Sequence, residues 1–194
     1  MRRLVLLGLG LVMLAAVGID AHGQKKEDLP RYIKDLTAKE PKDRVAACAG
    51  IGAIGELRKV YAKDAVDPLC DVLRKDADAT VRRAAAAALG QISADAVKAT
   101  PALIQGLKDA DNNVKVASAT SLAVIGPGAK EAAPTLKELN DAAKAEAAKA
   151  REEQTKAKTD GDKAKEKAAR DKGQAAGNLL RATGEALKNI GGGQ

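Results

Sequence analysis

The sequence predicts an all-α fold: a solenoid of about three and a half helix-pair repeats, followed by a charged C-terminal extension that is helical or partly disordered. Three observations predict it. The 194-residue chain has two tyrosines and no phenylalanine or tryptophan, yet 45% of its residues are hydrophobic, chiefly because alanine is abundant. Short motifs recur 33 residues apart. Apolar residues follow a helical period within each copy, whereas the alternation of an all-β fold is absent from the sequence.

The first 23 residues are predicted to form a secretory signal peptide. Arg2 and Arg3 precede an uncharged apolar run at 4–17, and Ala21 and Gly23 supply small residues for cleavage. An uncleaved anchor is less favoured, because spanning a bilayer needs about 20 apolar residues. We therefore expect an exported protein, periplasmic or secreted, with no stable membrane insertion after cleavage.

Residues 28–141 form the predicted repeat domain. KDADATV at 75–81 recurs as KDADNNV at 108–114. Prolines recur with the same spacing, at Pro68, Pro101 and Pro134. A repeat of this length indicates stacked supersecondary units that bury their apolar faces against their neighbours.

Each repeat is predicted to contain two short helices. In repeat two, an apolar stripe marks the first helix: Val81, Ala84, Ala85, Ala88, Leu89 and Ile92. Asp78 and Asp111 precede first helices, where a carboxylate accepts hydrogen bonds from free backbone amides. The recurring prolines stand where second helices begin, since the first turn tolerates proline. Gly90 either marks the end of its helix or allows a close helix contact.

The pattern resembles the HEAT-repeat family, in particular its short bacterial form, often labelled PBS-lyase HEAT-like. The resemblance rests on DADATVRRAAAAALGQI at 76–92, followed by PALIQGLKD at 101–109. It implies antiparallel helix pairs stacked in a right-handed superhelix, with the second helices lining the concave face. The lyase activity is not carried over, because nothing in the sequence marks a tetrapyrrole site.

The C-terminal extension is predicted in two parts. Residues 142–172 are rich in alanine, lysine and glutamate, and they form a charged helical or disordered spacer that Gly161 interrupts. Without larger aliphatic or aromatic residues, this spacer is not expected to dock firmly on any surface. Residues 173–194 regain some amphipathicity and are predicted as a short helix with a flexible end, which folds back on the solenoid or docks on a partner or membrane.

Two sets of residues are candidates for function. If the second helices line a concave face, charged side chains gather near one edge of it: Lys34, Asp35, Asp71, Arg74, Lys108, Lys137 and Glu138. Such a mixed-charge groove suits recognition of another protein, although a solvated surface explains the same residues. Cys48 and Cys70 in repeat one form either a disulfide across the helix pair or two small buried hydrophobes.

The residue pattern predicts no catalytic, cofactor or metal site. The single histidine, His22, lies in the predicted signal peptide. The pairs Asp76/Asp78 and Asp109/Asp111 recur with the repeat, which favours turn formation and helix capping over calcium binding. The net charge is +7, but both signs are interspersed and aromatic residues are scarce, so no nucleic acid partner is expected.

The leading hypothesis is therefore a non-enzymatic, monomeric scaffold that binds another protein through its solenoid surface. The alternative is a structural or stress-protective protein that acts through its charged tail. In composition, that tail is loosely similar to late-embryogenesis-abundant stress proteins.

Overall fold

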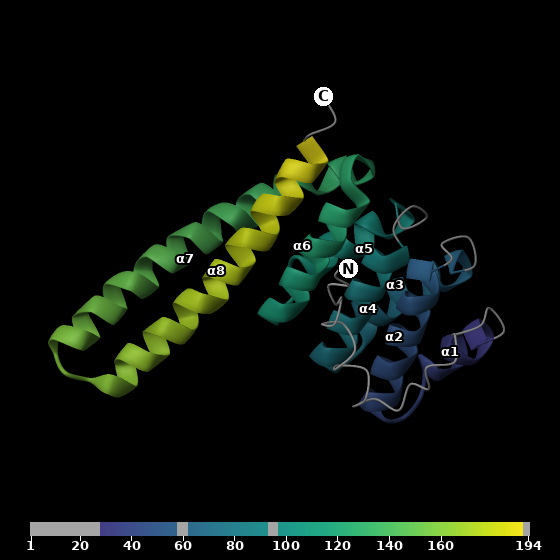
Figure 1. Ribbon diagram of the computed structural model, residues 1–194, viewed down its shortest axis with the longest axis horizontal. Coiled ribbons are helices and arrows are strands. Elements are labelled where there is room, and N and C mark those ends of the chain that lie inside the picture. The colour runs from purple at the N-terminus through teal and green to yellow at the C-terminus, as the bar shows by residue number, and fades with distance from the viewer. Residues whose placement is uncertain (1–27, 58–61, 93–96, 192–194) are drawn as a thin grey trace, which may run out of the picture.

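The computed structural model describes residues 28–57, 62–92 and 97–191, whose regular secondary structure is entirely helical (Figure 1). This confirms the predicted all-α solenoid. The helices are α1 (Leu29–Asp35), α2 (Pro41–Leu57), η3 (Lys63–Ala65), α3 (Val66–Lys75), α4 (Ala79–Ile92), α5 (Thr100–Gly106), α6 (Asn112–Ile125), η5 (Gly126–Ala132), α7 (Ala133–Thr159) and α8 (Lys163–Gly191). The predicted signal peptide and the extreme C-terminus, 192–194, lie outside the described residues.

The helices form two layers (Figure 1). One layer, here the first layer, consists of α2, α4, α6 and α8, each packed against the next. Helices α1, α3, α5 and α7 each pack against a first-layer helix, and α1, α3, α5 and the start of α7 are here called the second layer. Consecutive helices pair across the layers as α1/α2, α3/α4, α5/α6 and α7/α8. The solenoid therefore contains four stacked helix pairs, of which α7/α8 is the last.

The predicted apolar stripe of α4 faces the core. Val81, Ala85, Leu89 and Ile92 are fully buried, and they belong to a core that also receives leucines and isoleucines from the neighbouring helices. Gly90 is buried inside α4, where an added Cβ would lie 2.6 Å from Ser121 Oγ. Of the two roles considered for Gly90, close helix contact is therefore the one that the structure supports.

The ends of the repeat helices follow the local sequence. Pro101 and Pro134 occupy the first turns of α5 and α7, as expected. Gly126 ends α6 with a φ of 65°, a left-handed conformation that favours glycine. The short helix η5 then leads into α7.

The C-terminal extension is helical over 142–159 and 163–172, one of the two alternatives expected for the spacer. Helix α7 crosses residues 141 and 142 without a break, so the predicted domain boundary coincides with no helix end. The two helices separate at Gly161, which has a φ of 72°, and Asp162 caps α8 by accepting a hydrogen bond from the Lys165 amide at 3.0 Å. The C-terminal part of α8 folds back on α6, one of the two arrangements expected for residues 173–194.

The expectation that the charged segment would not dock is wrong. Helices α7 and α8 pack along their length as an antiparallel hairpin. Residues with low exposure recur in α7 at alternating steps of four and three, at Leu136, Asn140, Ala143, Ala147, Ala150, Gln154 and Ala157. A matching series in α8 contains Ala169, Gly173, Ala176, Leu180, Thr183, Leu187 and Ile190. This is the spacing of a coiled-coil seam, and alanine and glycine fill most of it near the tip of the hairpin.

Candidate functional site

The candidate partner-binding residues lie on the second layer. Lys34 and Asp35 are in α1, Asp71 and Arg74 in α3, and Lys108 follows α5. Lys137 and Glu138 are in the first turns of α7. All seven are exposed except Asp35, which is half-buried.

One ion pair among the described residues involves a member of this set. Asp71 Oδ1 lies 3.1 Å from the Nζ of Lys75, one helical turn away, and both side chains are more than half exposed. Such a surface pair contributes little stability. The remaining charges are therefore available to a partner, and the structure arranges them along successive helices rather than in one compact cluster.

Two largely buried ion pairs lie elsewhere in the solenoid, Arg44–Asp76 and Arg82–Asp109, and they are here called the ion-pair ladder. Arg44 donates to the Asp76 carboxylate from Nε and Nη2 at 2.6 and 2.8 Å. Arg82 makes the same two-pronged contact with Asp109, at 2.7 and 2.8 Å. In both pairs the remaining Nη1 group donates to two backbone carbonyls of the preceding turn. Each arginine thus fastens a first-layer helix to two inter-repeat turns.

The same aspartates shape the turns that follow them. Asp76 accepts a hydrogen bond from the amide of Asp78, and Asp109 accepts one from Asp111, at 2.9 and 2.8 Å. Asp111 then caps α6 by accepting from the amides of Asn113 and Val114. The prediction that the Asp-x-Asp pairs form turns and helix caps is confirmed, but their arginine partners were not anticipated. Each pair joins residues 32 or 27 positions apart, so no local pattern indicates it.

The ladder lowers the pKa of its carboxyl groups. For Asp76, burial opposes ionisation, but the hydrogen bonds from Arg44 and the Asp78 amide outweigh it and hold the pKa below its ordinary value. For Asp109, the hydrogen bond from Arg82 is the largest cause of a lowered pKa. The ladder is therefore ionised at neutral pH, and its chemistry is structural.

Cys48 in α2 and Cys70 in α3 are both free and buried in the structure. Loss of hydration on burial raises the pKa of Cys48 to about 12 and that of Cys70 to about 11. A thiol with such a pKa stays protonated and unreactive near neutral pH. This arrangement fits the second alternative for the pair, two small buried hydrophobes, and the disulfide stays a prediction.

An apolar groove of about 660 Å³ opens on the first layer, between α4 and α6. Small side chains line its floor, including Ala87, Gly90 and Ala117, and Val124 stands at its side with 56% of its surface exposed. Glu56 and Gln91 border it. The groove has the chemistry to take up an aliphatic side chain.

Two further features concern metal binding and membrane spanning. Within the described ranges, no three His, Cys, Asp or Glu side chains gather in a way that could hold a metal ion. No helix in the part of the chain that the structure describes combines the length and apolar character needed to cross a bilayer.

Comparison with known proteins agrees with the geometry. The family described as HEAT repeats matches the chain at residues 29–100 and again at 66–154. Together the matches extend from α1 into the distal half of α7. A search of curated proteins gave no match.

Proposed function

Because the chain belongs to the HEAT-repeat family, we propose that it is a non-enzymatic scaffold that binds another protein through its solenoid surface. Proteins with this fold commonly mediate protein–protein interaction. The observation that carries the proposal is the second layer, where successive helices present exposed charged side chains of both signs. Complementary charges of this kind direct the choice and orientation of a partner.

The proposed site lies on a rigid support. Each second-layer helix is fastened to the first layer by buried leucines, such as Leu69, Leu103 and Leu136. The Arg44–Asp76 and Arg82–Asp109 pairs fix the turns between the helices. A partner therefore meets charges whose spacing is set before binding, which lowers the entropic cost of association.

We propose further that the protein works outside the cytoplasm. The support is the sequence of residues 1–23, in which Arg2 and Arg3 precede an apolar run. N-terminal sequencing of protein recovered from the envelope or the medium should begin at His22 or Gln24. Recovery from the cytoplasm with Met1 retained would contradict this proposal.

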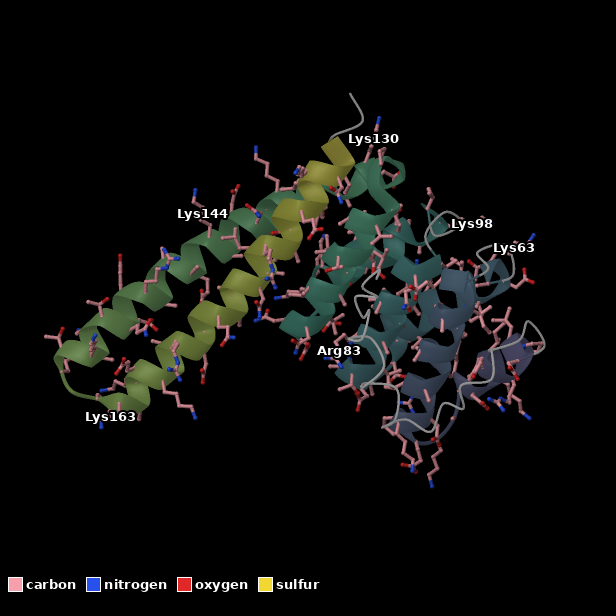
Figure 2. All side chains as sticks on the ribbon, in the orientation of Figure 1. Lys63, Arg83, Lys98, Lys130, Lys144 and Lys163 are labelled. Carbon is pink, nitrogen blue, oxygen red and sulfur yellow. The ribbon has the colours of Figure 1, made fainter. Side chains whose placement is uncertain are left out.

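The experiment for partner binding compares two variants of the mature chain that remove equal charge. The test variant carries Lys34→Ala, Arg74→Ala, Lys108→Ala and Lys137→Ala. The control variant replaces four cations away from these second-layer positions, Arg83, Lys130, Lys144 and Lys163 (Figure 2). Both variants should keep the circular dichroism and melting temperature of the parent, because all eight side chains are exposed.

Each protein is then used to capture partners from an extract of its own cell envelope. The proposal predicts that the parent and the control variant retain the same partner and that the test variant loses it. Equal retention by both variants would exclude the second layer as the binding surface.

The packing of the hairpin argues against the alternative, a protective function of the charged tail. A solvating tail of this kind is expected to be extended and unpacked. Here α8 completes the first layer instead, and Asn189 Nδ2 donates to the Ala123 carbonyl of α6 at 3.1 Å. The protective function would be favoured by two results together. The parent would capture no partner, and the test variant would still suppress the aggregation of a client protein.

A further inference from the structure

The ion-pair ladder stops at the third repeat, and the place of the missing pair is an open groove. With a repeat length of 33 residues, Lys115 is the equivalent of Arg82 in the next repeat, and Ala142 is the equivalent of Asp109. Lys115 is half-buried near the start of α6. Within the described ranges, no carboxylate forms an ion pair with it, and its Nζ donates to Asn112 Oδ1 at 3.3 Å.

The cause is the unbroken course of α7. In the first two repeats the second-layer helix ends just before the ladder aspartate, and Asp76 has an extended backbone with ψ of 134°. Helix α7 instead continues to Thr159, so position 142 lies on a helix and carries a methyl group. The chain thus keeps the cation of the third pair without a carboxylate bound to it, although Lys115 still attracts the nearby Asp109 carboxylate through space.

A groove of about 340 Å³ occupies this place, between the start of α6 and the facing sides of α7 and α8. Its floor is apolar and includes Leu139, Ala142, Ala176 and Leu179. Its polar lining comes from Asn112, Lys115, Glu146 and Lys172. Two cations and one anion leave the lining with a net positive charge.

Both lysines are able to receive a carboxylate from outside. Lys172 Nζ lies 3.4 Å from Glu153 Oε2, but this pair is exposed and contributes little. Lysine carries a compact charge on a flexible stem, so it can follow an incoming group more easily than the planar fork of arginine. The small floor residues permit close approach of another backbone.

The shape of the groove favours a helical ligand. Helix α6 covers the side of α8 near its C-terminus and begins at Asn112. Nearer the hairpin tip, a second groove shares Lys172 with the first and continues between Ala157 of α7 and Ala168 of α8. Because the two grooves share Lys172, a helix placed in line with α6 would meet both of them.

We propose that this groove binds an amphipathic helix of another protein, which places an Asp or Glu carboxylate at Lys115 beside an aliphatic side chain on the Leu139 and Leu179 floor. The two intact ladder pairs show, within the same molecule, that a cation at this position holds a carboxylate. The site is separate from the second-layer charges and does not depend on the function proposed for them.

The test uses the mature chain and two fluorescein-labelled, twelve-residue peptides. One contains alanine, leucine and glutamate, and its counterpart has glutamine in place of every glutamate. Fluorescence anisotropy gives the dissociation constants. Lys115→Met should weaken binding of the glutamate peptide about three- to tenfold, because it removes one close charge pair. The matched control, Lys144→Met, removes an exposed lysine from α7 that does not line the groove, and it should leave the affinity unchanged.

Two further variants do not depend on losing Lys115. Glu146→Gln removes the only anion of the lining and should tighten binding, whereas Ala142→Asp supplies a competing internal carboxylate and should weaken it. The glutamine peptide should bind more weakly than the glutamate peptide and be indifferent to Lys115→Met. Equal effects of Lys115→Met and Lys144→Met would overturn the proposal, as would equal binding of the two peptides or weaker binding after Glu146→Gln.

Discussion

The solenoid and the distal hairpin are both rich in alanine, but alanine has a different role in each. The distal hairpin is the part of the last helix pair beyond the solenoid, at 143–159 and 163–175. In the solenoid, alanines such as Ala85 and Ala88 bring helices close together while leucine and isoleucine supply most of the buried surface. In the distal hairpin, alanines such as Ala150 and Ala169 form the buried seam almost alone.

The difference has an energetic consequence. Burial of a leucine or isoleucine side chain contributes about 1.5–3 kcal/mol, whereas burial of a single carbon group contributes about 0.8 kcal/mol. The distal hairpin therefore depends on good helix formers and on the docked part of α8, which contributes Ala186 and Ile190 to the main core. We expect it to open locally at a lower free energy than the solenoid.

The largest contrast is expected from truncating one buried side chain in each region, because the solenoid buries leucine where the hairpin buries alanine. Leu122→Ala empties a fully buried position of α6 and should cost about 2–5 kcal/mol. Ala150→Gly in the hairpin seam should cost about 1 kcal/mol, chiefly through helix propensity. Urea unfolding of the whole chain measures the first change, and hydrogen exchange of α7 measures the second. Equal costs would show that the two regions do not differ as described.

The ion-pair ladder gives the next largest effect, confined to the solenoid. Arg82→Met leaves the largely buried Asp109 carboxylate unpaired and should lower the free energy of unfolding by about 2–3 kcal/mol. Arg83→Met is the matched control, because Arg83 is exposed on the same helix (Figure 2). The control should change stability by less than about 0.5 kcal/mol. If the ladder contributes nothing to stability, Arg82→Met and Arg83→Met should have the same free energy of unfolding.

Acid should weaken the solenoid through the same carboxyl groups. The pKa values of Asp76 and Asp109 are lower in the folded state than in the unfolded state. Their contribution is therefore fully present above the unfolded pKa, about 4, and is lost as pH falls through the folded values. Asp109→Asn should reduce the fall in stability below about pH 4, whereas exposed Asp171→Asn should not. An unchanged acid profile in Asp109→Asn would contradict the assignment.

The smallest effects are expected from two glycine substitutions in the hairpin, one of which should lower its stability and the other raise it. Gly161 has a positive φ at the turn, so Gly161→Ala should destabilise the hairpin by about 1 kcal/mol. Gly177 lies on α8, and an added Cβ would meet no neighbouring atom within 4 Å, so Gly177→Ala should stabilise the helix by roughly 0.5–1 kcal/mol. Hydrogen exchange of the α7 and α8 amides should reveal both changes without loss of protection in α4.

The two regions also differ in how far the sequence predicts them. Leucine and isoleucine in the stripe of α4 mark its buried face, and the Asp-x-Asp turns mark the starts of α4 and α6. The hairpin seam was missed because alanine and glycine on a charged background give no apolar contrast. Their spacing was still informative: Ala143, Ala150 and Ala157 recur every seven residues.

Part of the candidate site depends on tertiary structure that no local pattern shows. The ladder joins Arg44 to Asp76 across 32 residues, and the pairing follows only once the helices are stacked. The groove at Lys115 depends on α7 continuing past position 142. The change in composition there predicts a domain boundary instead of a continuous helix. Prediction therefore succeeded where an element is specified locally and failed where one helix serves two regions.

Helix α8 is the last helix of the first layer, not an appendage. Hydrogen exchange of α6 amides in the full chain tests it most directly, using Ala186→Asp, which places a charge where α8 meets the core. Asn178→Asp adds the same charge to the exposed side of α8 and serves as the control. If α8 supports α6 in this way, amide exchange of residues 114–125 should accelerate more than about tenfold in Ala186→Asp and stay at the parental rate in the control. Faster exchange confined to α8, with α6 unchanged, would contradict it.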